Sequence, residues 1–357
     1  MSVQTPQVPG LYFTAAPRPA APSPLRSDVA GFIGRTRRGH PGCLVRVEGW
    51  REYVREFGGL DADSTTSYAV RGYFDNGGQV AYLVRLCGAN AKTAGVELDL
   101  LKPDGRTLGV APAGLLRTAY RIEATSPGRW ARAARVFIRY RRAGSDGRPE
   151  LDFVIHVPDE PAEYLSGLDP RGTDENALEA QLARRSQFIR LLPGGIEVAD
   201  PDAKGGPLQA SWSLALTLDP VSDANERPSK TDYLEAIEPS ENSAGGGQGR
   251  CPEEKIAAGA ARAWGLADEP EVAIVAVPDL HTDIVEPGER LDILSRLVMC
   301  AEESRDRLVL IDLPPQSASG GSLKDADEVA RWVELLRTRL ALLESPPEPP
   351  GGTLTAA

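Results

Sequence analysis

The sequence stretches that decide the fold are residues 29–59, VAGFIGRTRRGHPGCLVRVEGWREYVREFGG, and residues 68–86, YAVRGYFDNGGQVAYLVRL. The first stretch opens with small and apolar residues typical of a buried strand, followed by a loop and a second short strand. Aromatic and apolar residues then recur at steps of three and four along Trp50 to Phe57, which predicts one face of a helix ending at Gly58-Gly59. The second stretch predicts a further helix, an Asn-Gly-Gly turn and a strand. Strand, helix and strand in this order predict an α/β layer.

Residues 91–264 have a different pattern. The runs VELDL, YRIEAT, RVFIRYR and LDFVIHV alternate apolar and polar residues and are separated by Pro-Asp-Gly, Ser-Pro-Gly and Ser-Asp-Gly turns. Such alternation is typical of antiparallel strands. We therefore expect a β-rich insertion domain at 91–264, with a helical or mixed segment at 176–192 and a strand at 211–218.

The α/β pattern returns between residues 265 and 345. The apolar runs at 272–277 and 308–313 predict two buried strands, and the periodicity at 291–302 and 325–343 predicts two helices. The predicted fold class is α/β, in which residues 28–90 and 265–345 build a core domain of a sheet flanked by helices. Residues 346–357 are expected to form a flexible tail.

Residues 1–27 are rich in proline and alanine, which excludes a helix and favours an extended N-terminal arm. A floppy tail fits the composition equally well, but the apolar cluster within the arm favours docking onto a neighbouring sheet. The predicted subunit-interface residues are Val8, Pro9, Gly10, Leu11, Tyr12 and Phe13.

Composition restricts the class of protein. The chain has 357 residues with 41% hydrophobic and 25% charged residues, which is typical of globular proteins. The net charge of -11 argues against a nucleic-acid partner, and we expect the arginine runs at 35–38 and 139–142 to lie in solvated loops or at strand ends. We also expect no signal peptide, no direct membrane insertion, synthesis and assembly in the cytoplasm, and reduced thiols at Cys43, Cys87, Cys251 and Cys300.

Residues that could carry chemistry are few. Asp279 and Asp312 each lie at the end of a predicted buried strand, where α/β sheets often place ligand-binding groups, so a metal-dependent enzyme is one alternative. No third ligand is evident, and Asp in this position commonly bonds its own backbone two residues on, which favours a structural role. The glycine pairs lack the spacing of a phosphate-binding loop. We expect no catalytic residues, no metal and no cofactor.

The motifs, taken in order, resemble those of the contractile tail sheath family of phage tails and injection systems. The similar segments are Pro9 to Tyr12, Ala30 to Gly39, Trp50 to Gly58, Tyr68 to Gly78, Ser126 to Trp130, Val272 to Leu280 and Cys300 to Pro314. Ala131 and Arg132 depart from the Gly and Asn that the family has after its Ser-Pro-Gly-x-Trp turn. The family's C-terminal block, with a Tyr-Tyr-Pro-Trp strand, has no counterpart after ALLESPP, so the resemblance implies that one of two interlocking chain ends is lacking.

This resemblance implies a structural subunit rather than an enzyme. The implied assembly is a helical sheath of stacked hexameric rings around an inner tube. Contraction of the sheath ejects the inner tube. The sheath is part of a phage tail-like particle that can be released from the cell. The implied partners are other sheath subunits, the inner tube protein, and baseplate and cap proteins. A non-contracting sheath-like cap or baseplate-proximal component is the second structural alternative.

Overall fold

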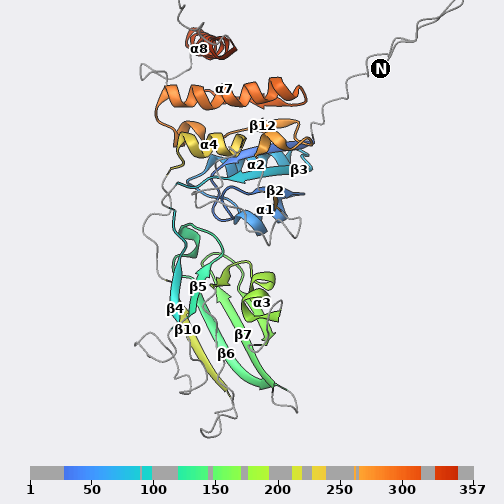
Figure 1. The fold of residues 1–357 in the computed structure, drawn as a ribbon, viewed down its shortest axis with the longest axis vertical. Coiled ribbons are helices and arrows are strands. Elements are labelled where there is room, and N and C mark those ends of the chain that lie inside the picture. Colours follow the sequence, from blue (N-terminus) through green and yellow to red (C-terminus); the bar gives the residue numbers. More distant parts are fainter. Residues whose placement is uncertain are drawn as a thin grey trace, which may run out of the picture.

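The computed structural model describes residues 28–88, 91–98, 120–143, 148–169, 176–192, 211–218, 227–238, 261–262, 265–314 and 326–344. These residues form an α/β unit around a six-stranded sheet and a β-rich unit around two smaller sheets (Figure 1). The two units lie end to end along the long axis of the molecule, with α7 and α8 at one extremity and the β-rich unit at the other.

The six-stranded sheet has the strand order β11-β2-β3-β1-β12-β13. β3, β1, β12 and β13 run parallel, whereas β2 is antiparallel to β3 and β11 is antiparallel to β2. Every residue of β1 and β3 is buried, as expected for parallel strands covered on both faces. The strands are β1 Val29–Gly34, β2 Leu44–Val47, β3 Val80–Arg85, β11 Ala261–Arg262, β12 Ile274–Ala276 and β13 Leu308–Leu310.

Helices cover both faces of this sheet. Alternate side chains of β1 divide between the two layers: Phe32 packs with Tyr53 and Phe57, while Ile33 packs with Tyr233 and Ile293. The first layer contains α1 Trp50–Phe57 and α2 Thr65–Asp75, and the second contains α4 Lys230–Ile237, α6 Leu280–Asp283, α7 Pro287–Ser304 and α8 Ala326–Glu344. α1 ends at Gly58, which has a left-handed φ of 82°.

The β-rich unit is antiparallel throughout its described pairs. One sheet has the order β4-β5-β9 and the other β10-β6-β7-β8, and a single hydrophobic cluster joins them with α3. Its elements are β4 Gly95–Leu98, β5 Tyr120–Ala124, β6 Arg135–Ala143, β7 Arg148–His156, β8 Glu163–Leu168, α3 Leu178–Arg185, β9 Ile189–Leu191 and β10 Ser211–Thr217.

The predicted α/β fold class is confirmed, and the structure differs from the sequence expectations in three details. α4 and β11 fall inside the expected insertion range 91–264, yet α4 packs in the α/β core and β11 pairs with β2. β8 was not predicted. The expectation that 308–313 forms a buried strand is wrong, because β13 lies at the edge of the sheet that the described residues form and its Leu308 and Leu310 are 53% and 51% exposed.

The expectation of reduced thiols is wrong for Cys43, which is disulfide-bonded to a partner outside the described residues. Its distance in sequence from the other cysteines gave no hint of this, because a disulfide requires only proximity in space. Cys87 and Cys300 are free, and burial raises the pKa of both thiols.

Candidate functional site: the buried joint between the two units

The loop Arg35–Gly39, which directly follows β1, lies where the α/β unit meets the β-rich unit. Its side chains and backbone contact α1, α2, α6, the end of β3 and the turns of the β-rich unit. We call this loop, together with Arg85, Asp279, Asp283 and the turn Ser126–Trp130, the joint. Carboxyl ends of parallel strands are where α/β sheets usually place their functional groups.

Asp279 follows β12 and is fully buried. Its carboxylate accepts hydrogen bonds from the Arg35 backbone N–H at 2.9 Å, from the Thr65 N–H at 2.5 Å and from the Thr66 hydroxyl at 2.8 Å. The Ser64 hydroxyl lies 3.0 Å from the carboxylate and 2.6 Å from the Arg35 carbonyl, so its single proton is shared between them. A carboxylate at the first turn of α2 also interacts favourably with the helix dipole. Asp279 therefore ties β1 and α2 to the end of β12.

Gly34 makes this approach possible. A Cβ atom at position 34 would lie 2.0 Å from the Thr66 hydroxyl oxygen and 2.9 Å from a carboxylate oxygen of Asp279. Since real Cβ contacts are longer, only glycine fits between β1 and the capped end of α2. Glycine at the last position of β1 is thus a packing requirement of the joint.

Asp283 forms a second buried carboxylate in α6. It pairs with the Arg35 guanidinium at 2.7 Å and accepts a hydrogen bond from the Tyr233 hydroxyl at 2.8 Å. Burial, with a smaller contribution from the charge of Asp279, raises the pKa of Asp283 to about 6, although Arg35 and Tyr233 favour the ionised form. Asp283 thereby holds α4 and α6 against the start of the loop.

Arg85, the last residue of β3, is 4% exposed and contacts both units. Its three nitrogens donate to the Thr36 carbonyl at 3.2 Å, the Gly39 carbonyl at 2.5 Å and the Pro127 carbonyl at 2.9 Å. Two of these acceptors belong to the loop, and the third belongs to the β-rich unit. One guanidinium thus links three chain segments, a geometry that the point charge of lysine cannot reproduce.

Arg38 is equally buried and links α1 to the β-rich unit. It donates to the Val54 carbonyl at 2.9 Å and the Arg55 carbonyl at 2.7 Å in the last turn of α1. It also pairs with Glu160 at 3.1 Å and lies 4.9 Å from the centre of the Phe188 ring. Burial lowers the pKa of Arg38, and Glu160 opposes that shift. A buried cation with this set of partners fixes the relative position of the elements that supply them.

The turn Ser126–Trp130 supplies the opposing surface of the joint. The Gly39 backbone N–H donates to the Ser126 hydroxyl at 3.1 Å, and the Trp130 indole N–H donates to the Ser126 carbonyl at 3.2 Å. Gly128 has a φ of 139°, and a Cβ there would lie 2.9 Å from the Trp130 ring and 3.2 Å from the Arg37 carbonyl. The turn therefore needs glycine for both its conformation and its close approach to the loop.

The joint corrects two expectations. The prediction of a solvated loop is wrong for Arg38, which is buried because backbone carbonyls and Glu160 match its charge. Arg139 and Arg141 are solvated, but they lie within β6 rather than in a loop, and both pair with Asp152. Contrary to expectation, the Asp279 side chain does not bond its own backbone two residues on. Its partners are 213 to 244 residues away in sequence.

The structure does not unite Asp279 and Asp312 in one site. Asp312 is exposed, and its backbone carbonyl accepts a hydrogen bond from Nε2 of His281 at 2.6 Å. Arg290 approaches Nδ1 of the same ring at 3.3 Å, so both ring nitrogens of His281 are engaged. Within the described ranges, no group of three or more His, Cys, Asp or Glu side chains is arranged to hold a metal ion.

The predicted interface residues Val8, Pro9, Gly10, Leu11, Tyr12 and Phe13 lie outside the described residues. Sequence reasoning missed Arg85, Asp283 and Tyr233 as members of the joint. Arg85 carries a readable signal, since it is a lone charge within the apolar run VAYLVRL. In the part of the chain that the structure describes, no helix has the length and apolar character needed to cross a bilayer.

Several solved structures are similar to this chain, and two of them are sheath tail proteins. No protein-family model and no curated protein matches the chain. A sheath tail protein from Listeria innocua is similar at a TM-score of 0.43 and 11% identity, with 85% of this chain and 55% of that chain covered. A sheath tail protein from Desulfitobacterium hafniense is similar at a TM-score of 0.43 and 11% identity, with 91% of this chain and 61% of that chain covered. The chain spans less than two thirds of the length of either structure.

Replacing Asp279 by Asn should lower the free energy of unfolding by about 3 kcal/mol, because an amide nitrogen would face backbone N–H donors that have no other partner. Asp312→Asn is the matched control and should change stability by less than about 0.5 kcal/mol, since its side chain is exposed. Chemical denaturation measures both values, and metal analysis of the purified proteins accompanies it. Equal effects of the two substitutions, or a stoichiometric divalent metal lost in both variants, would contradict the structural role of Asp279.

The raised pKa of Asp283 predicts a specific pH dependence. Because its folded pKa of about 6 exceeds its usual 3.8, its contribution to stability is fully present below pH 4 and is lost as pH rises through 6. Arg35, Tyr233 and Asp279 face this carboxylate, and Arg227 also acts on it. Between pH 4 and 7, the wild type should lose up to about 3 kcal/mol of stability relative to Asp283→Asn. A stability difference that stays constant over this range would show that the pKa of Asp283 is not raised.

Proposed function

We propose that the chain is a structural subunit of a contractile injection apparatus, a sheath protein that assembles with further copies around an inner tube. The observation that carries the proposal is the joint. The sheath-like motifs around Gly34 to Gly39, Ser126 to Trp130 and Pro278-Asp279 are far apart in sequence, yet all of them contribute to it. Residues that resemble a family's motifs thus serve to hold two units together, which is a mechanical role.

The chemistry of the joint supports a structural role over an enzymatic one. The Asp279 carboxylate is buried and surrounded by protein donors, and Asp283 is buried between Arg35 and Tyr233. Among the described residues, both carboxylates are at most 5% exposed. The buried cations Arg38 and Arg85 contact the β-rich unit through Glu160 and the Pro127 carbonyl, and these contacts oppose rotation of that unit about the α/β unit.

We further propose that the N-terminal arm docks onto an adjoining copy through Val8 to Phe13. The fourteen residues between Phe13 and Asp28 can span roughly 50 Å, which is enough to leave the parent unit. β13 is a suitable acceptor because it is an edge strand with exposed Leu308 and Leu310. An extended apolar segment can add to such an edge through backbone hydrogen bonds.

Contacts between different surfaces of identical subunits generate rings or open helical filaments. We propose hexameric rings stacked into a contracting sheath, with inner tube, baseplate and cap proteins as further partners, in a particle that can be released from the cell. The second candidate is a non-contracting cap or baseplate-proximal component. Exposed leucines on a sheet edge favour assembly in both cases.

Electron microscopy and sedimentation velocity of the full chain, alone and co-expressed with an inner tube protein, test the proposal. Long tubes would support the sheath proposal, and isolated rings would support the cap or baseplate-proximal alternative. The triple substitution Leu11→Ser, Tyr12→Ser, Phe13→Ser should abolish assembly by removing the docking side chains, and Leu308→Lys with Leu310→Lys should do the same from the acceptor side.

The control for the arm is Ala15→Ser with Ala16→Ser, which changes the same segment without removing large apolar groups. These control particles should be indistinguishable from the wild type. A wild-type chain that stays monomeric in both conditions would refute the assembly role. Normal assembly of the triple variant would refute the arm as the connecting element.

A further inference from the structure

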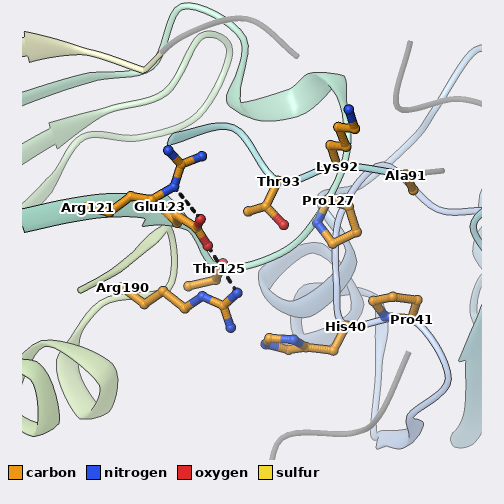
Figure 2. A pocket seen from close by; sticks show the side chains of 10 residues that line it. All are labelled: His40, Pro41, Ala91, Lys92, Thr93, Arg121, Glu123, Thr125, Pro127 and Arg190. Atoms are coloured by element: carbon orange, nitrogen blue, oxygen red, sulfur yellow. Dashed lines mark hydrogen bonds and ion pairs between the residues drawn. The ribbon is translucent and has the colours of Figure 1, made fainter. Parts of the chain in front are cut away.

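A cleft of about 400 Å³ opens along the seam between the two units, beside the joint (Figure 2). His40 and Pro41 line it from the loop between β1 and β2, and Pro127 lines it from the turn of the β-rich unit. The remaining lining residues come from the segment just before β4 and from β5, β9 and their ends. They are Ala91, Lys92, Thr93, Arg121, Glu123, Thr125 and Arg190. Clefts between structural units are common places for ligands.

The lining carries an excess of positive charge. Arg121 donates to one carboxylate oxygen of Glu123 at 2.7 Å, and Arg190 donates to the other at 3.3 Å. A single carboxylate is therefore shared by two guanidinium groups, and Lys92 adds a third cation. This excess stands out in a chain with a net charge of -11.

Arg190 has unused hydrogen-bonding capacity. Its Nε atom is buried and has no hydrogen-bond partner among the described residues. Figure 2 shows the guanidinium of Arg190, the ring of His40 and the hydroxyl of Thr93 pointing toward the middle of the cleft. A buried N–H without a partner is costly, and a group that accepts a hydrogen bond from it would remove that cost.

We propose that this cleft binds an oxyanion, a phosphate or carboxylate group, with Arg190 as its main charged contact and Thr93 as a hydroxyl donor. The planar fork of N–H donors in arginine matches the oxygens of both groups. The oxyanion comes either from a free small anion or from an acidic side chain of a second copy of this chain, whose charge is complementary. Because His40 and Pro41 line the cleft from the α/β unit, an oxyanion bound to Arg190 and Thr93 lies next to both units. The site does not depend on the proposed sheath function.

Isothermal titration of the full chain with inorganic phosphate and with citrate at low ionic strength tests the site. Arg190→Gln should weaken binding about tenfold, as expected for one charge-assisted hydrogen bond. Glu123→Gln should strengthen binding, because it removes the carboxylate that competes for both arginines. Arg132→Gln, an exposed arginine of the β-rich unit outside the cleft, is the matched control and should bind like the wild type.

Sedimentation velocity of the same proteins distinguishes the two sources of the oxyanion. If a second copy supplies it, phosphate should compete with self-association, and Arg190→Gln should weaken self-association while Arg132→Gln should not. Thr93→Val keeps every charge and should weaken binding modestly, so the test remains valid if Arg190→Gln folds poorly. The proposal fails if Arg190→Gln and Arg132→Gln behave alike in both measurements, or if Glu123→Gln weakens binding as Arg190→Gln does.

Discussion

The structure depends on burying charged side chains where its two units meet. A guanidinium or carboxylate removed from water is stable only when hydrogen bonds and opposite charges satisfy it. Arg38 and Arg85 meet this requirement with backbone carbonyls and Glu160, and Asp279 meets it with N–H and hydroxyl groups. Each partner set comes from several segments, so the elements cannot move apart without exposing an unmatched charge. This requirement for mutual satisfaction fixes the orientation of the β-rich unit.

Such a joint resists relative motion of the two units. Hydrophobic contacts tolerate sliding, whereas directed hydrogen bonds from one guanidinium to three carbonyls do not. The apolar core of each unit is separate, and the polar joint supplies the coupling between them. The geometry accounts for glycine at positions 34 and 128, since any side chain there would separate the surfaces that the charges hold together.

Local patterns predicted the fold class because they reflect local physics. The apolar runs of β1 and β3 and the aromatic stripe of α1 gave strands and a helix where the structure has them. α4 was missed although Ser229 and Asp232 form a capping box, a signal that can be read from sequence. β8 was missed because its pattern is mixed and includes Gly167 at a φ of 68°. The joint could not be predicted, because a charged run is normally solvated and the partners of Arg85 and Asp279 are 42 to 244 residues away.

Differential scanning calorimetry of Arg85→Met tests most directly whether buried charge couples the two units. The wild type and the exposed control Arg51→Met should unfold in a single cooperative transition. Arg85→Met should unfold in two transitions, because the carbonyls of Thr36, Gly39 and Pro127 lose their shared donor and each unit retains its own core. A single transition at the wild-type temperature would contradict the account.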